Sequence, residues 1–335
     1  MQLPSIRKAI LYGARDLRMV EAPPPDELLP HQVFVQTNVT ALSTGTDLAN
    51  YDGRSEELPN APSYPRAVGY SNIGTVLQVG SSVTRLAAGD RVFSTRPHCS
   101  GYVAEETDLL VKIDPRVDAE QASLVYLTHL GSAALRKVNY LPGENVLVIG
   151  LGVIGLCTVA LASSLGAQVE AVANHANRLE LARAMNAQQV WDSASVDPAA
   201  VFGGRGADVT VLTANPWSAY KTALEASAHS GRISLLGFPG RAQPQPDFNP
   251  LDAEWIYGKQ LTIAGAGGTP RVECGPEEIR FNLRRSLEDI LGRLADGRMN
   301  FAPLISHRIP AESMRDGYEM ALAHDKSLTS AVFLW

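Results

Sequence analysis

Three glycines at fixed spacing, close to the middle of the chain, could bring a backbone against a phosphate group. The apolar run 145–149 leads into Gly150, Gly152 and Gly155, in the pattern G-x-G-x-x-G, and the segment 156–165 continues at helical spacing. This order predicts a strand, a tight turn and a helix. Gly150 would form the turn, Gly152 would let the backbone approach a pyrophosphate, and Gly155 would allow the helix to pack closely on the strand.

The predicted helix starts at Val153 and Ile154, just after the second glycine. The first N–H groups of a helix have no partner within the helix, and the positive end of the helix dipole lies there, so this end favours an anion. Because a strand precedes the motif and a helix follows it, we predict a dinucleotide site. It is formed by Gly150, Gly152, Val153, Ile154 and Gly155.

The end of the next predicted strand indicates which dinucleotide binds. An Asp or Glu about 20 residues after the glycines accepts hydrogen bonds from the adenosine ribose of NAD. This position holds Ala173, and the donors Asn174, His175 and Arg178 follow it. A 2′-phosphate would be tolerated or held there, so the sequence favours NADP(H) over NAD(H). The alternative is that some of these three residues belong to an ordinary surface loop and a solvated helix face.

The elements that must position this site fall into two groups. Short strand-like runs at 8–12, 33–39, 73–80 and 90–93 predict a small irregular barrel, and the pattern becomes helical over 119–138. Strand-like runs at 146–149, 169–172, 209–213 and 233–236 then alternate with helices, which predicts a doubly wound parallel sheet. A last helix over 276–296 leads into strands at 306–309 and 329–334. The expected fold class is α/β, with a β-barrel domain and a parallel-sheet domain.

Composition limits the classes of partner. A chain of 335 residues fits two domains, and 45% hydrophobic with 19% charged residues is typical of a soluble globular protein. A net charge of -6 gives no reason to expect a nucleic acid or an anionic membrane. The N-terminal segment has no signal-peptide pattern and no window is apolar enough to span a membrane, so we expect a cytoplasmic protein. Cys99, Cys157 and Cys274 are too widely spaced for a disulfide framework or a cysteine zinc cluster.

Nearly the whole chain resembles the medium-chain dehydrogenase/reductase superfamily. The motifs that carry the resemblance follow one another in the family's order: Gly45-Thr46-Asp47, Tyr51-Asp52-Gly53, Pro65 with Gly69, Gly74-Thr75-Val76, Gly89-Asp90-Arg91-Val92, Gly101-Tyr102-Val103 and the glycines from Gly150 to Gly155. The resemblance implies a GroES-like β-barrel domain at 1–120 and 267–335 and a Rossmann domain at 121–266. It also implies a small-molecule substrate and a homodimer joined through an edge strand at 261–265.

The chain departs from the zinc-dependent members of that superfamily. Those members carry the motifs C-G-T-D-x-H and G-H-E, whose side chains close around a catalytic metal. Here Thr44, Ala49, Tyr70 and Ser71 occupy the corresponding positions, and none of them is a usual zinc ligand. The cysteine lobe that holds a structural zinc would fall near 93–102, where only Cys99 occurs. We therefore predict neither a catalytic nor a structural zinc.

Without a metal, side chains must stabilise charge on the substrate oxygen. Thr46 occupies the hydroxyl position that passes on the alcohol proton in zinc relatives, and Tyr70 would direct its phenol to the same centre as a general acid or oxyanion donor. His98 lies in the shortened loop that should border the substrate cleft, and imidazole titrates near neutral pH. We predict these three as catalytic residues. The alternatives remain that Tyr70 fills the space of the lost zinc and that His98 is structural.

Four further residues are assigned to substrate binding. Thr44 and Asp47 flank the Gly-Thr motif, Tyr51 follows it, and His129 lies on the helix that leads into the parallel-sheet domain. For Asp47 the alternative is a buried carboxylate that fixes its loop through backbone hydrogen bonds. For His129 the alternative is again a structural role.

The leading hypothesis is a zinc-independent oxidoreductase that moves a hydride between NADP(H) and an alcohol or carbonyl group of a small organic molecule. A first alternative keeps the cofactor but reduces an activated C=C or C=N bond. A second alternative is a cofactor-binding protein without catalysis, since a lost metal site is also what such a protein could show.

Overall fold

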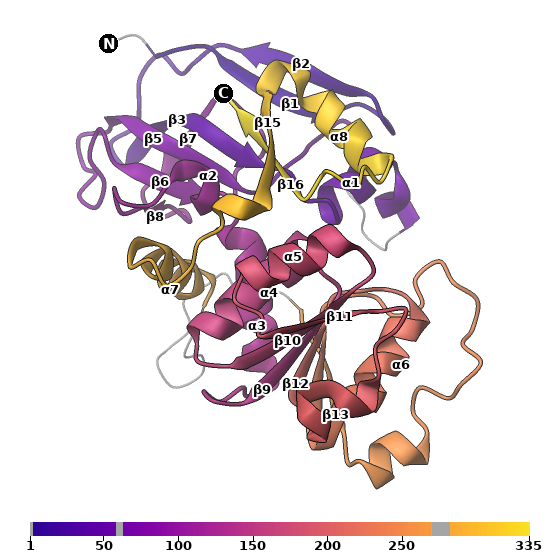
Figure 1. The fold of residues 1–335 in the computed structure, drawn as a ribbon. Coiled ribbons are helices and arrows are strands. Elements are labelled where there is room, and N and C mark those ends of the chain that lie inside the picture. The colour runs from indigo at the N-terminus through magenta and orange to yellow at the C-terminus, as the bar shows by residue number, and fades with distance from the viewer. Residues whose placement is uncertain (1–2, 58–62, 268, 270–281) are drawn as a thin grey trace. The chain divides into compact units, whose positions relative to one another are not determined.

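The computed structural model describes residues 3–57, 63–267, 269 and 282–335 (Figure 1). The chain separates into two compact units, Met1–Val125 with Leu304–Trp335 and Tyr126–Pro303. Cys274 and the start of the helix predicted over 276–296 lie outside the described residues. Among the described residues, no helix is both long and apolar enough to cross a membrane.

The first unit consists mainly of β-strands in two sheets. The smaller sheet has the strand order β2-β1-β4, with bounds Leu17–Ala22, Ile6–Leu11 and Arg66–Ala67. The larger sheet has the order β15-β16-β3-β5-β6-β8, with β7 also paired to β3. Its strands are β15 Ile305–Pro310, β16 Ser330–Leu334, β3 Gln32–Ala41, β5 Asn72–Val79, β6 Arg91–Ser94, β8 Val111–Lys112 and β7 Gly101–Glu105.

The end of the chain completes this larger sheet. Strand β16 runs antiparallel to β3, with Val332 opposite Ala41 and Leu334 opposite Val39. Apolar side chains from both ends of the sequence therefore share one core, in which Phe333 is fully buried. Short helices complete the unit: α1 Thr46–Tyr51, η1 Arg54–Glu57, α2 Ala119–Ala122, η5 Ala311–Ser313 and α8 Met314–Leu322. Helix η4 (Ala302–Leu304) spans the boundary at which the second unit ends and the first resumes.

Helix α2 shows how the sequence sets a boundary. Asp118 precedes the helix, and its carboxylate accepts hydrogen bonds from the N–H groups of Glu120 (3.0 Å) and Gln121 (3.1 Å). A carboxylate at this position satisfies N–H groups that have no partner within the helix. Helix α3 (Val125–Lys137) follows and leads into the second unit.

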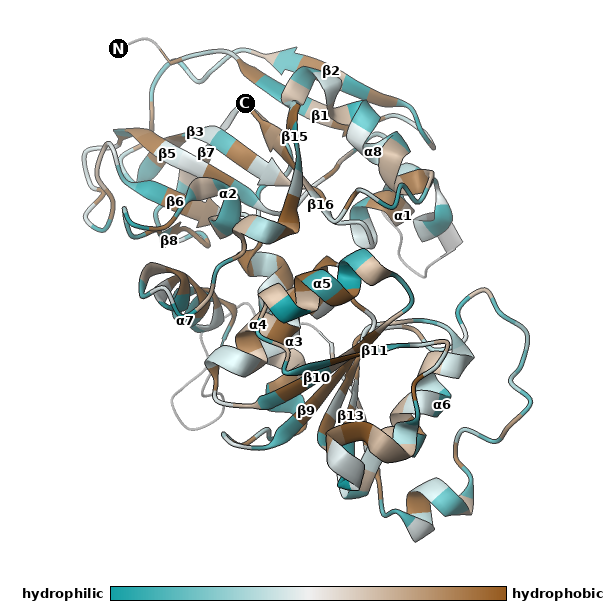
Figure 2. Cartoon of the chain, in the orientation of Figure 1, coloured by the Kyte–Doolittle hydropathy of each residue, from teal (hydrophilic) through white to brown (hydrophobic). Residues whose placement is uncertain are grey.

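The second unit is built on one parallel sheet with the order β11-β10-β9-β12-β13-β14. Numbered within the unit, this is 3-2-1-4-5-6, the order of a dinucleotide-binding doubly wound sheet. The strands are β9 Asn145–Ile149, β10 Gln168–Ala173, β11 Gln189–Asp192, β12 Ala207–Leu212, β13 Ser227–Leu235 and β14 Thr262–Gly265. In Figure 2 the middle of the sheet has the brown of hydrophobic residues, as expected of strands covered on both faces. The predicted fold class is confirmed.

Helices cover the two faces of this sheet. Figure 1 shows α4 (Val153–Ser164) and α5 (Ala176–Ala184) on one side and α6 (Trp217–Ala226) on the other. Turns η2 (Pro198–Gly204) and η3 (Glu254–Gly258) lie in the connections between strands.

Helix α7 (Leu283–Ala295) belongs to the second unit. Arg293 on this helix donates a hydrogen bond to the carbonyl oxygen of Ser164 (3.0 Å), at the end of α4. The sequence assigned 267–303 to the first domain, whereas the described part of this segment clusters with the second unit up to Pro303. The hydrogen bond from Arg293 to Ser164 ties α7 to the second unit and is one physical reason for the difference.

Candidate functional site

The turn after β9 has the geometry that the glycine motif requires. Gly150 has a φ of +95°, a conformation that residues with a side chain rarely adopt. Its N–H donates to the carbonyl of Val172 (3.0 Å), and its own carbonyl accepts a hydrogen bond from the Thr213 hydroxyl (2.7 Å). The turn is therefore tied to the two neighbouring strands β10 and β12.

The other two glycines differ in what surrounds them. A Cβ added to Gly155 would lie 1.9 Å from the carbonyl oxygen of Gly150, so helix α4 packs directly on the turn. A Cβ added to Gly152 would meet nothing within 4 Å, so one side of the turn is open. Gly152 also caps α4 without a side-chain hydrogen bond, which leaves the first N–H groups of this helix to an anion. Val153 and Ile154 are the first two residues of the helix.

A cavity of about 510 Å³ lies where these glycines meet the ends of the neighbouring strands. The turn after β9 and the turn after β12 both contribute to it, and between these two strands the strand order reverses. Sheets of this type bind their ligands at such a reversal point, outside the carboxyl ends of the strands. The lining residues are Ile149, Gly150, Leu151, Gly152, Val172, Ala173, Asn174, His175, Arg178, Ser193, Thr213, Ala214, Asn215, Pro216, Ser218, Ala219 and Thr222.

One end of the cavity holds the residues that the sequence assigned to cofactor choice. Ala173, Asn174, His175 and Arg178 all line it, and no acidic residue is among the lining residues in the part of the chain that the structure describes. Asn174 and His175 are exposed. Burial lowers the pKa of the half-buried Arg178 guanidinium, which still remains positively charged at neutral pH.

Sequence reasoning missed several polar residues of this cavity. Ser193 follows β11, while Thr213 and Asn215 follow β12, and all three line the cavity together with Thr222 on α6. The signal was present: residues that directly follow parallel strands meet at one edge of the sheet, so the position after each predicted strand was a candidate.

In the first unit, Asp47 lies inside the protein and contacts backbone. Its side chain is 1% exposed, Oδ2 accepts a hydrogen bond from the N–H of Ser43 (3.0 Å), and Oδ1 accepts one from the N–H of Gly69 (3.2 Å). Burial raises its pKa to about 7, although these two hydrogen bonds oppose the shift. The observed contacts are those of the alternative interpretation, a carboxyl group that fixes its loop.

His98 is also buried, with 0% of its surface exposed. Its ring packs edge-on against Phe333, with ring centroids 5.1 Å apart, and its Nε2 lies 4.0 Å from Oδ2 of Asp47. Neither ring nitrogen has a hydrogen-bond partner, and burial lowers the pKa of the imidazole to about 3. We expected this side chain to border a substrate cleft; the structure instead turns it into the core, as an uncharged ring.

Tyr51 and His129 are interior residues as well, contrary to the expectation that they line a substrate pocket. The Tyr51 hydroxyl donates to Oε1 of Glu319 (2.6 Å), and its ring lies 4.7 Å from that of Tyr318. Burial, together with Glu319, raises the pKa of Tyr51 to about 12. His129, in α3 of the second unit, contacts the carbonyl of Tyr126 through Nδ1 and is 1% exposed. Local packing and hydrogen bonds account for both side chains.

Three of the residues that the sequence assigned to catalysis or substrate binding in the first unit keep accessible surface. Thr46 is exposed, and Thr44 and Tyr70 are half-buried. Tyr70 directly follows Gly69, and the N–H of Gly69 donates a hydrogen bond to Asp47. Burial raises the pKa of Tyr318, and the charges of Asp47, Tyr70 and Tyr51 raise it further.

At two of the positions that hold metal ligands in the zinc relatives, the side chains of this protein are buried and make other contacts. The hydroxyl of the buried Ser71 donates a hydrogen bond to the carbonyl of Ser123, and Ala49 is buried in α1. Within the described ranges, no three His, Cys, Asp or Glu side chains are grouped so that they could hold a metal ion.

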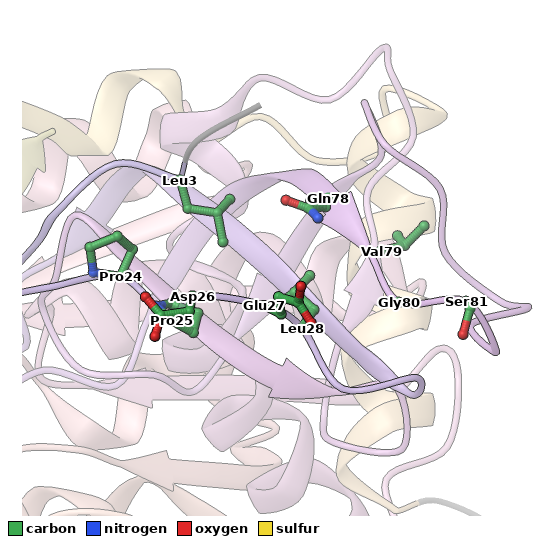
Figure 3. Close-up of a pocket in the computed structure, with 10 residues that line it drawn as sticks. All are labelled: Leu3, Pro24, Pro25, Asp26, Glu27, Leu28, Gln78, Val79, Gly80 and Ser81. Carbon is green, nitrogen blue, oxygen red and sulfur yellow. The ribbon is translucent and has the colours of Figure 1, made fainter.

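A second cavity, of about 500 Å³, lies in the first unit away from these residues (Figure 3). Leu3, the loop from Pro24 to Leu28 and the segment from Gln78 to Ser81 line it. None of the residues assigned to chemistry contributes to it.

Comparison with known proteins defines the class. Residues 29–147 match the alcohol dehydrogenase GroES-like domain, and residues 153–281 match the zinc-binding dehydrogenase domain. The chain is thus an oxidoreductase of the alcohol dehydrogenase type. It belongs to the medium-chain dehydrogenase/reductase superfamily, and the resemblance noted in its sequence is confirmed.

Relatives match over almost the full length. A sorbitol dehydrogenase from Bacillus subtilis is 23% identical, with 95% of this chain and 94% of the relative covered. An L-threonine 3-dehydrogenase from Rhizobium johnstonii is 25% identical, with 95% and 96% covered.

Solved structures share the fold. Galactitol-1-phosphate dehydrogenase from Escherichia coli has a TM-score of 0.81 at 18% identity, covering 98% of this chain and 100% of that chain. A protein from Sinorhizobium meliloti described as a zinc-binding dehydrogenase, bound to NADP, has a TM-score of 0.79 at 18% identity, covering 99% and 100%. An alcohol dehydrogenase from E. coli complexed with NADH also has a TM-score of 0.79, at 19% identity, covering 99% and 100%. Structures that share this fold thus include one bound to NADP and one bound to NADH.

Proposed function

We propose that this protein is a zinc-independent oxidoreductase that transfers a hydride between NADP(H) and an alcohol or carbonyl group of a small organic molecule. The observation that carries the proposal is the cavity at the carboxyl edge of the parallel sheet. Gly150 and Gly152 give it an open backbone turn at a helix N-terminus, and Arg178 gives it a cation. The absence of an acidic residue among its described lining residues supports NADP over NAD, because a carboxylate there would repel a 2′-phosphate.

The relatives support an alcohol and carbonyl pair as the reacting group. Their names describe dehydrogenases of sorbitol and of L-threonine, and both of these compounds carry alcohol groups. We extend this type of bond, but neither of these substrates, to the present chain.

The chain's own side chains supply the proton chemistry. NADPH supplies the hydride when bound, so reduction of a carbonyl needs one proton on the substrate oxygen. Tyr70 donates this proton in our proposal, and the exposed Thr46 hydroxyl passes a proton from solvent. Thr44, half-buried in the same loop, contacts the substrate. In the oxidative direction the same groups accept the proton.

Zinc independence rests on the side chains that replace the expected ligands. Thr44, Ala49, Tyr70 and Ser71 carry neither thiolate, imidazole nor carboxylate, and the hydroxyl of Ser71 already donates to backbone. We propose that phenol and hydroxyl donors stabilise the developing charge that a Lewis acid stabilises in the zinc relatives.

The first experiment is a fluorescence titration with NADPH and with NADH, together with elemental analysis of protein purified without added metal. Tighter binding of NADPH and no bound zinc support the proposal. Preference for NADH, or one zinc per chain, contradicts it. A panel of ketones, alcohols and enones, followed at the nicotinamide absorbance, then tests the reacting bond. If only enones are turned over, the proposal is replaced by reduction of an activated C=C bond. If no compound is turned over, it is replaced by a cofactor-binding role without catalysis.

We also propose that the protein forms a homodimer through β14. Strand β14 is at the edge of the parallel sheet. Among the described residues it pairs only with β13. Large apolar side chains are exposed in the segment that leads to it, among them Tyr257 at 86% and Leu251 at 68%. An unpaired edge is a ready site for pairing with a second chain. Light scattering that gives the mass of a single chain would contradict this proposal.

A further inference from the structure

Two loops of the first unit carry the polar side chains proposed for chemistry, and Asp47 joins them. Its Oδ2 accepts a hydrogen bond from Ser43 (3.0 Å), in the loop that leads to Thr46. Its Oδ1 accepts one from Gly69 (3.2 Å), directly before Tyr70. The side chain is 1% exposed, so water does not compete for these bonds. One carboxyl group with an oxygen on each loop fixes the distance between the two loops.

The ring of His98 also packs on Gly69. A Cβ added to Gly69 would lie 2.6 Å from atoms of this ring, and Gly69 has a φ of +88°. The backbone of His98 is held in turn, since its N–H donates to Val68 (2.8 Å) and its carbonyl accepts from Ala9 (3.0 Å). Phe333 packs edge-on against the ring, so the imidazole has no space to withdraw. Gly69 thus has two neighbours in the core, the carboxyl group of Asp47 at its N–H and the ring of His98 at its Cα.

The imidazole ring of His98 contacts Gly69 by packing and not by hydrogen bonding. Neither ring nitrogen has a hydrogen-bond partner, and the 4.0 Å between Nε2 and Oδ2 of Asp47 exceeds a hydrogen-bond distance. Both side chains lie inside the protein, so neither can reach a substrate without a rearrangement. Their common feature is the contact with Gly69.

We propose that Asp47 and His98 are positioning residues that clamp the loops 43–46 and 69–70 together and so orient Tyr70. The proposal rests on the proposed function, in which Tyr70 donates the proton. In zinc relatives, side chains from the corresponding two motifs meet on a metal ion. In this chain a carboxyl group and a buried ring hold the two loops without one.

The test compares wild type with His98→Ala, His98→Phe and Asp47→Asn. We expect His98→Ala and Asp47→Asn to lower kcat by about tenfold or more with an unchanged KM for NADPH, because small displacements of a catalytic group are costly. His98→Phe keeps the ring and removes its nitrogens, so it should restore kcat close to the wild-type value. Amide hydrogen exchange, resolved to Ser43 and Gly69, should become faster in His98→Ala and Asp47→Asn.

Met314→Ala is the matched control. Met314 is buried in the same core as Phe333, so its truncation lowers the melting temperature without removing a contact to Asp47 or His98 that we observe. It should leave kcat and the exchange at Gly69 unchanged. If this control slows turnover as much as His98→Ala does, the effect is general loss of stability and the clamp is refuted.

The remaining outcomes also decide. A His98→Ala variant with the kcat of wild type overturns the proposal. A His98→Phe variant that is as slow as His98→Ala also overturns it, because that result would assign the ring nitrogens of His98 to the chemistry. Hydrogen exchange needs no turnover, so an inactive protein contradicts the proposed function while exchange still tests the clamp. If no variant folds, wild type alone decides: slow exchange at Ser43 and Gly69 supports the clamp, and exchange as fast as at the exposed Gly45 overturns it.

Discussion

The two units hold their candidate sites by different physical means. In the second unit the backbone forms the site: Gly150 makes a turn, Gly152 leaves it open and Gly155 lets a helix pack on it. In the first unit the proposed site consists of side chains, and Asp47 accepts a hydrogen bond from Gly69, directly before Tyr70. A site made from backbone can be recognised from the spacing of glycines. A site made from side chains depends on which of them the fold turns inward.

The largest expected effect breaks the backbone site by one methyl group. Gly155→Ala places a Cβ against the carbonyl of Gly150, where neither partner can change rotamer. We expect a loss of about 3 kcal/mol in the free energy of unfolding of the second unit, or roughly 10 °C in melting temperature by calorimetry. Gly152→Ala is the matched control, since its Cβ meets nothing. It should keep the melting temperature and weaken only NADPH binding; equal stability losses in both variants would contradict the distinction.

The next effect concerns the side-chain site. Tyr70→Phe removes the proposed proton donor and keeps the ring, so we expect kcat to fall about 100-fold while the Kd for NADPH stays constant. Stopped-flow measurement of hydride transfer with saturating NADPH would show the loss directly. An unchanged rate would leave Tyr70 as the residue that fills the space of the missing metal.

A smaller effect separates charge from backbone within the cofactor cavity. Arg178→Ala should weaken NADPH binding by about 2 kcal/mol, or roughly 30-fold, because a charged hydrogen bond to a phosphate is lost. Binding of NADH should not change. Arg183→Ala, near the other end of the same helix and exposed, removes the same charge and should leave both affinities intact. Equal losses for NADH and NADPH in Arg178→Ala would refute the assignment of Arg178 to the 2′-phosphate.

The smallest effect tests whether the two units respond separately. Asp118→Ala removes the cap of α2 in the first unit, which should cost about 1 kcal/mol. Thermal unfolding should report this loss, and a fluorescence titration should give the wild-type Kd for NADPH. Weakened NADPH binding would show that the first unit's stability limits the second unit's site.

The sequence predicted the architecture well because its signals are local. Apolar runs such as 146–149 and 169–172 became β9 and β10, and the glycines after the first run form the predicted turn. Strands β2, β4, β7, β8 and β11 were missed, and β2 and β11 show why. Leu17–Ala22 has only partly buried or exposed side chains, and the four residues of Gln189–Asp192 are too few to show a period.

The side-chain site could be predicted only in part. The motif around Thr46 and the replaced ligand at Tyr70 could be found from position along the chain, and the structure leaves both side chains accessible, so their assignment stays a prediction. The burial of His98 and Tyr51 depends on contacts with Phe333 and Glu319, which lie more than 200 residues away in sequence. No local pattern reports such contacts, so residues of a chemically suitable type were assigned to a pocket when they belong to the core.

The pairing of β16 with β3 has a consequence for biosynthesis. Strand β3 is translated before the second unit, but its partner at Val39 to Ala41 is supplied by residues 332–334, which follow that unit. The second unit is continuous from Tyr126 to Pro303, so its whole sheet leaves the ribosome before that partner exists. The second unit can therefore fold during synthesis, whereas the larger sheet of the first unit keeps an open edge at β3 until residues 332–334 have been synthesised. During that interval the edge of β3 is the part of the nascent chain most in need of protection from wrong pairing.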